Sequence, residues 1–132
     1  MVDVGIREWT AEQGTILPSS QRDYHTREFW TDAPYLTRDA AEWLADCAPT
    51  AIAFDFPQDY SIRLLLDGVV ALTEEHVTHD VCLRRGITLI EYLVNTTELV
   101  GPTCFLSAAP LNLPNADGSP AHVYGIEGLL RD

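Results

Sequence analysis

Hydrophobic and polar residues are grouped along this chain in short segments that predict helices and strands in alternation. The segment 37–48, TRDAAEWLADCA, is typical of a helix, because Thr37 is a suitable N-cap, Asp39 lies near the positive end of the helix dipole, and Pro49 ends the segment. Its apolar and small side chains are predicted to share one broad face, made of Ala40, Ala41, Trp43, Leu44 and Cys47.

A second helix is predicted in residues 73–85, TEEHVTHDVCLRR. Thr73 is a suitable N-cap, the two glutamates after it favour the start of a helix, and the two arginines favour its end. Gly86 follows as a natural C′ residue, since glycine readily adopts the left-handed conformation that ends many helices.

Apolar segments between the helices predict β-strands. These segments are 15–17 (TIL), 50–56 (TAIAFDF), 87–94 (ITLIEYLV), 103–111 (TCFLSAAPL) and 121–126 (AHVYGI). Turns are expected at Asp67–Gly68 and Asp117–Gly118. Strands that alternate with helices predict a mixed α/β fold.

The composition is that of a soluble globular protein. The chain has 132 residues, the usual size of one domain, so residues 1–132 are predicted to form a single domain. Eight basic and twenty acidic residues give a formal net charge of −12, which argues against nucleic acid or an anionic membrane as a partner, because both need a basic surface. The sequence shows neither a secretory leader nor an apolar segment long enough to span a membrane, so we expect a cytoplasmic protein.

The cysteines do not indicate a disulfide or a zinc knuckle. Cys47, Cys82 and Cys104 are odd in number, lie far apart in the sequence and form no C-x-x-C pair. We therefore expect all three to be reduced and mostly buried.

Candidate chemistry is concentrated between His76 and Glu91. On the predicted helix His76 and His79 are three residues apart and share a face, which Cys82 and Leu83 continue. Glu91 interrupts an apolar strand and needs a partner if it is buried. One imidazole and one carboxylate suit zinc or manganese. An isolated histidine on a helix is nevertheless most often a surface residue or a hydrogen-bonded core residue, so spacing alone leaves both interpretations open.

Other titratable residues are less informative. Asp55 lies at the end of a predicted buried strand, a common position for a site, and Asp59 follows four residues later, but loop-facing carboxylates are the simpler interpretation. His25 is interpreted as solvated. His122 could line a pocket, although we favour a structural role for it.

Two long segments resemble the C-terminal half of the cyclase family, which includes bacterial kynurenine formamidases and isatin hydrolase. They are 78–99, THDVCLRRGITLIEYLVNTTEL, and 105–127, FLSAAPLNLPNADGSPAHVYGIE. Family members carry a histidine, a short helix that ends in glycine, an apolar strand with a glutamate, and then PL…G-x-D-G-S-P…A-I. Matching positions here are Pro110–Leu111, residues 117–120 and Ile126, and the resemblance covers about 14–127.

The resemblance implies both a fold and an activity. The family fold is a swivelling β/β/α domain with a mixed sheet or open barrel and flanking helices. Its enzymes hydrolyse amide-type bonds of small molecules, including formamides and lactams, with one or two divalent metals, zinc or manganese. Two family ligands resemble His79 and Glu91, so the resemblance implies that these residues bind metal.

One part of the family pattern is missing from the chain. The family's main metal motif, His-x-x-x-His-x-Asp, has no counterpart here, and Ala121–His122 stands where the family has a basic residue. The domain is therefore expected to be incomplete. In one hypothesis the chain is half of an arylformamidase-like hydrolase, working as a homo-oligomer or with a chain that supplies the N-terminal half. The alternatives are a non-catalytic, degenerate member with a binding or structural role, and a truncated product of a longer reading frame.

Overall fold

The computed structural model describes residues 25–129, so the strand predicted at 15–17 lies outside the described residues. The chain divides into two compact units after Val94, and each unit is described by itself. The first contains α2 (Arg27–Thr31), α3 (Arg38–Asp46), β1 (Ala51–Ala53), α4 (Ile62–Leu66), η2 (Thr73–Glu75), η3 (His79–Leu83) and β2 (Thr88–Ile90). The second contains η4 (Thr96–Glu98), β3 (Phe105–Pro110) and β4 (Ala121–Ile126).

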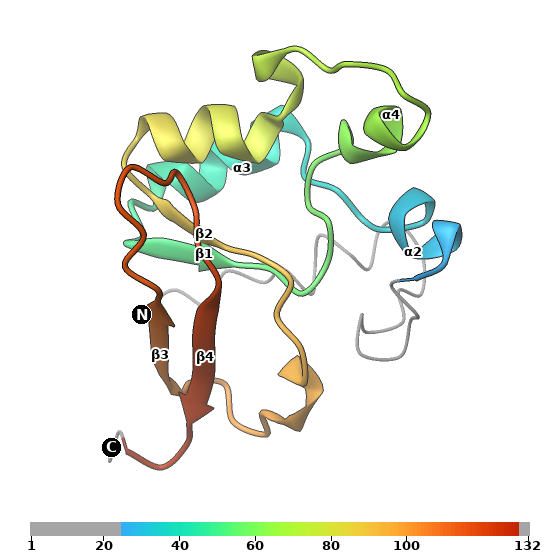
Figure 1. The fold of residues 1–132 in the computed structure, drawn as a ribbon. Coiled ribbons are helices and arrows are strands. Elements are labelled where there is room, and N and C mark those ends of the chain that lie inside the picture. Colours follow the sequence, from blue (N-terminus) through green and yellow to red (C-terminus); the bar gives the residue numbers. More distant parts are fainter. Residues whose placement is uncertain (1–24, 130–132) are drawn as a thin grey trace. The chain divides into compact units, whose positions relative to one another are not determined.

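The mixed α/β prediction is confirmed for the described residues, which form two small open sheets flanked by helices (Figure 1). The prediction of a single domain over residues 1–132 stays a prediction. None of the helices between residues 25 and 129 has the length and apolar character needed to cross a bilayer.

Helix α3 forms where the sequence predicts it. The hydroxyl oxygen of Thr37 accepts a hydrogen bond from the Ala40 amide at 3.3 Å, as expected of an N-cap. The predicted apolar face is wrong at two positions, since Trp43 is 47% exposed and Cys47 is also exposed. Ala45 is buried instead. The buried face is therefore displaced from the predicted one, away from Trp43 and Cys47 and toward Ala45.

Strands β1 and β2 pair in parallel, with Ile52 opposite Leu89 (Figure 1). Both strands are shorter than the predicted ranges 50–56 and 87–94. Beyond the ladder the amide of Phe54 still donates to the Ile90 carbonyl at 2.8 Å. Strand β2 ends because Tyr92 has a left-handed backbone with φ of 58°, which turns the chain. Glu91 therefore follows the strand directly and does not lie within it.

The helix predicted at 73–85 is divided into two parts. The first is the short η2, whose N-cap position is Leu72 and not the predicted Thr73, and the Glu75 carboxylate accepts a hydrogen bond from the Leu72 amide at 2.6 Å. The helical path breaks at His76, whose ψ of 72° is not helical. A second helical segment covers residues 77–84 and contains the π-helical turn η3.

Gly86 ends this segment as predicted. Its φ of +75° is left-handed, its amide donates to the Leu83 carbonyl, and the Ile87 amide donates to the Cys82 carbonyl, each at 3.0 Å. This pair of bonds is the Schellman arrangement, which satisfies the last carbonyls of a helix. The chain then enters β2 with Ile87 buried.

The core of the first unit lies between α3, the helical segment that contains η3, and the parallel strands β1 and β2. Helix α3 and segment η3 pack beside each other, and η3 also contacts β2 (Figure 1). Cys82 is fully buried, whereas Leu83, predicted to continue the same face, is 50% exposed. The buried cluster consists of Leu36, Ala40, Ala41, Leu44, Ala45, Ile52, Phe54, Phe56, Val81, Cys82 and Ile87.

The second unit is an antiparallel hairpin. Strands β3 and β4 pair along six residues each, from Phe105 opposite Ile126 to Pro110 opposite Ala121, close to their predicted ranges. The turn predicted at Asp117–Gly118 is wrong, since the connecting loop turns at Asn115, whose φ is 61°. All three cysteines are free, but only Cys82 is buried, so the prediction that they are mostly buried is wrong for exposed Cys47 and half-exposed Cys104.

The left-handed conformation of Gly86 predicts a specific stability difference. A Cβ atom at Gly86 would meet no atom within 4 Å, so Gly86→Ala should cost about 1 kcal/mol of unfolding free energy through backbone strain alone. Gly118→Ala is the matched control, because Gly118 has equally open surroundings and no left-handed φ. Urea unfolding followed by circular dichroism measures both variants. Equal stability of the two would show that residue 86 does not need a left-handed backbone.

Candidate functional site

The fully buried polar side chains of residues 25–129 all belong to one cluster in the first unit. They are Gln58, Asp59, Ser61 and Thr78, each at most 1% exposed. Three of them come from the turn after β1, and Thr78 comes from the helical segment that carries η3. Buried polar groups are unfavourable unless they are hydrogen-bonded, so a cluster of this kind indicates a specific arrangement.

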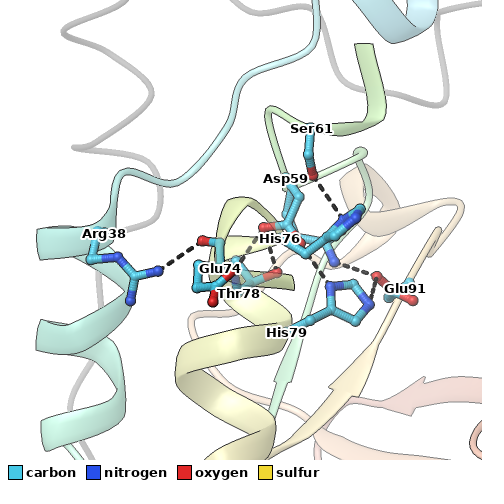
Figure 2. Close-up of polar contacts among 9 residues, drawn as sticks. Arg38, Asp59, Ser61, Glu74, His76, Thr78, His79 and Glu91 are labelled. Carbon is cyan, nitrogen blue, oxygen red and sulfur yellow. Dashed lines mark hydrogen bonds and ion pairs between the residues drawn. The ribbon is translucent and has the colours of Figure 1, made fainter. Parts of the chain in front are cut away.

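Asp59 is the centre of this cluster (Figure 2). Its Oδ1 atom accepts hydrogen bonds from the amide of Thr78 at 2.7 Å and from the Thr78 hydroxyl at 2.8 Å. Its Oδ2 atom lies 2.7 Å from Nδ1 of His79. A carboxylate only accepts hydrogen bonds, so Nδ1 of His79 carries a proton.

The other ring nitrogen of His79 faces Glu91 (Figure 2). His79 Nε2 lies 3.6 Å from Oε1 of Glu91, and the Gln58 amide also donates a hydrogen bond to that oxygen. The side chains of His79 and Glu91 are 39% and 30% exposed, whereas Asp59 is inaccessible. The structure thus brings together His79 and Glu91, the two predicted ligands, on the accessible side of a buried carboxylate.

The electrostatic environment favours charge on both Asp59 and His79. Burial by itself raises the pKa of Asp59, but hydrogen bonds from His79 and Thr78 outweigh it, so the pKa lies below its usual value. The hydrogen bond to Asp59 raises the pKa of His79 above 6.5, against the opposing effect of burial and with support from the Glu91 charge. Burial, followed by the charges of Glu91 and Asp59, raises the pKa of the adjacent Tyr92.

Local backbone features place these side chains. His79 is the first residue of the π-helical turn, and such turns occur frequently at functional sites. Glu91 follows the carboxyl end of β2, while Gln58 and Asp59 lie on the turn that leaves the parallel partner β1. The carboxyl ends of parallel strands are the usual place for ligands in α/β proteins.

The donor atoms fit a divalent cation in type but not in number. An imidazole nitrogen and a carboxylate oxygen are ligands that zinc and manganese accept. A carboxylate on the far nitrogen of a histidine is also the usual outer-shell partner of metal-binding histidines. Within the described part of the chain, however, no group of three or more potential ligands occurs, and a catalytic zinc normally takes three.

Comparison with known proteins gives one informative similarity. Neither a protein-family model nor a curated protein matches the chain. The chain is similar to a solved structure described as a potential metal-dependent hydrolase with cyclase activity. The two are 30% identical, and the match covers 80% of this chain with a TM-score of 0.56. The chain spans 45% of the length of that structure.

This similarity supports a cyclase-like family of metal-dependent hydrolases in general. It does not distinguish the kynurenine formamidase and isatin hydrolase subfamilies, which stay predictions. Zinc and manganese are likewise not distinguished. A cyclase-like hydrolase of this kind is consistent with the mixed α/β architecture of the described residues.

The described residues contain no group of three potential ligands to which His76 or His122 could belong. His76 is held by Ser61, whose hydroxyl oxygen is 2.8 Å from Nδ1 of His76. The His76 and His79 rings are 6.1 Å apart between centroids, in an edge arrangement. His122 lies on β4 in the second unit, where its ring contacts Tyr124.

Sequence reasoning missed Asp59 and Gln58 as site residues. The interpretation of Asp59 as a loop-facing carboxylate is wrong, because the side chain is fully buried and hydrogen-bonded by Thr78 and His79. The signal that could have found both residues is their position directly after an apolar strand, where polar side chains of α/β proteins converge.

The raised pKa of His79 predicts how the stability of the metal-free chain depends on pH. The folded state binds the His79 proton more tightly than the unfolded state. The contribution of the protonated His79 to the free energy of unfolding is therefore complete below about pH 6.5, and it is lost as the pH rises through the folded-state pKa.

The free energy of unfolding should accordingly fall as the pH rises above 6.5, the ordinary histidine value. Urea unfolding in the presence of a chelator, at a series of pH values, measures this slope. His79→Gln should reduce the slope because it removes the titrating group. An identical slope in the two proteins would mean that His79 is not the group responsible.

Proposed function

We propose that this chain carries part of the metal site of a cyclase-like hydrolase that cleaves amide-type bonds in small molecules, as an arylformamidase does. The observation that carries the proposal is the line of contacts from Asp59 through His79 to Glu91. The similarity to a potential metal-dependent hydrolase with cyclase activity supports the same reaction class.

His79 and Glu91 would hold the cation, which we propose to be zinc or manganese. Nε2 is the nitrogen of His79 that points away from Asp59, and Glu91 offers a carboxylate oxygen beside it. When bound, a divalent cation supplies Lewis acidity, which polarises a carbonyl group and activates water for attack. Because both ligand side chains are partly exposed, a small molecule can approach them from solvent.

A site with two protein ligands needs completion. We propose that a further segment or a second chain with the His-x-x-x-His-x-Asp pattern supplies the remaining ligands. A homo-oligomer would cover exposed apolar surface, but it cannot provide a motif that the sequence lacks. The shortage of ligands among residues 25–129 also favours the second candidate function, a non-catalytic subunit with a binding or structural role.

Metal binding separates these functions. The chain, alone or with a companion that carries the missing motif, should bind Zn²⁺ or Mn²⁺ in calorimetric titrations. His79→Ala and Glu91→Ala should each weaken binding by about tenfold or more, since even outer-shell changes have effects of that size. His122→Ala is the control, because His122 is not one of the predicted ligands and its ring contacts Tyr124.

Hydrolysis of an aryl formamide by the completed assembly is the second readout. Release of the aryl amine that requires both the cation and Glu91 would support the enzyme. Metal binding without hydrolysis of formamides or lactams would favour the non-catalytic subunit. Absence of metal binding in every combination would exclude the hydrolase proposal for this chain.

A further inference from the structure

The turn after β1 holds the candidate site from one side. Gln58, Asp59 and Ser61 lie within four consecutive residues, all are buried, and each hydrogen-bonds to a different titratable side chain. Gln58 contacts Glu91. Asp59 contacts His79, and Ser61 contacts His76 (Figure 2). Two of these three contacts reach the predicted metal ligands.

We propose that Gln58 and Asp59 are positioning residues that orient the two ligands before any cation binds. Asp59 sets the proton position and ring orientation of His79, and Gln58 sets the orientation of the Glu91 carboxylate. This inference rests on the proposed function, because it assigns roles relative to a cation held by His79 and Glu91.

The two oxygens of Asp59 have different tasks. Oδ1 is occupied by both donors of Thr78, and Oδ2 is left for Nδ1 of His79. The proton of the neutral imidazole must then lie on Nδ1, since only a donor can contact a carboxylate oxygen. Nε2 consequently keeps its lone pair on the side that faces Glu91.

Thr78 also fixes the direction of this contact. Its amide belongs to the residue directly before His79, so the same carboxylate holds the backbone at the start of the π-helical turn and the ring that emerges from it. Rotation of the Asp59 carboxylate would break contacts with both residues. The ring is therefore held by a carboxylate that Thr78 itself holds through two hydrogen bonds.

Gln58 acts on the second ligand through a neutral donor. The backbone carbonyl of Gln58 accepts a hydrogen bond from the Leu36 amide at 3.0 Å, which fixes the backbone at this position. The side-chain NH₂ group of Gln58 donates a hydrogen bond to Oε1 of Glu91. An amide orients a carboxylate without cancelling its charge, so Glu91 remains available to a cation. The Oε1 atom of Gln58 is buried and has no hydrogen-bond partner within residues 25–129, an arrangement that costs stability.

The first test needs no variant and no metal. Nitrogen-15 NMR of the metal-free chain at alkaline pH, where the imidazole is neutral, reports which ring nitrogen of His79 carries the proton. The inference requires the Nδ1–H form. Finding the Nε2–H form in the wild-type chain would overturn it.

Asp59→Asn is the decisive variant. Asparagine has one acceptor oxygen, which the two donors of Thr78 would retain, so the NH₂ group would face Nδ1 of His79. The imidazole should then switch to the Nε2–H form, which the NMR spectrum shows directly. Zn²⁺ affinity should fall by about 10- to 100-fold, the usual effect of losing an outer-shell partner.

Asp80→Asn is the matched control for the loss of one negative charge. Asp80 follows His79 in the chain but pairs with Arg38 and Arg84. It should leave the proton position of His79 and the Zn²⁺ affinity nearly unchanged. If Asp59→Asn behaves like Asp80→Asn in both measurements, Asp59 does not position His79.

Gln58→Met tests the second role separately. It should weaken Zn²⁺ binding by about tenfold while the proton stays on Nδ1 of His79, because the Asp59 contact is intact. Unchanged affinity in this variant would remove Gln58 from the inference. Circular dichroism and thermal unfolding of each variant show whether the fold is retained.

The outcomes also separate this inference from the proposed function. If the wild-type chain binds no metal in any combination, the proposed function fails and the ligand roles fail with it. If the wild-type chain binds Zn²⁺ and the Asp59 and Gln58 variants bind it equally well, only the positioning inference fails.

Discussion

The burial of the Asp59 carboxylate is the constraint on which the first unit depends. A charge that is inaccessible to water is tolerated only when donors surround it. Here the donors come from Thr78 and His79, about twenty positions further along the chain. The turn after β1 must therefore lie against the start of the η3 segment. That contact fixes the end of one strand, the start of one helical segment and the orientation of the candidate site together.

Local sequence signals were sufficient for the elements that local interactions determine. The N-cap at Thr37, the left-handed Gly86 and the two strands of the hairpin were all predicted, because capping, glycine conformation and alternating apolar residues act over a few positions. The pairing of His79 with Glu91 followed from resemblance to a family. Spacing alone left that pair open, since an isolated histidine on a helix is compatible with several roles.

Tertiary contacts decided the features that the sequence did not reveal. The break at His76 has no glycine or proline to mark it, and it coincides with a hydrogen bond to Ser61, fifteen positions earlier. Glu91 was expected inside a strand but follows it, because Tyr92 turns the backbone. Asp59 looks like many loop carboxylates in a single sequence. It differs from an ordinary loop carboxylate only because Thr78 and His79, distant in the sequence, pack against it and bury it.

The charges around His79 bear directly on the proposed cation site. Two carboxylates, Asp59 and Glu91, face one imidazole, and when that ring is protonated its second proton lies on Nε2, on the side of Glu91. A divalent cation bound by Nε2 and Glu91 would replace that proton, so cation and proton compete for the same nitrogen. The hydrogen bond from Nδ1 to Asp59 strengthens both competitors, because it raises the basicity of the ring. Under the proposed function, this arrangement would hold the histidine ready for a cation and keep the buried carboxylate hydrogen-bonded when none is bound.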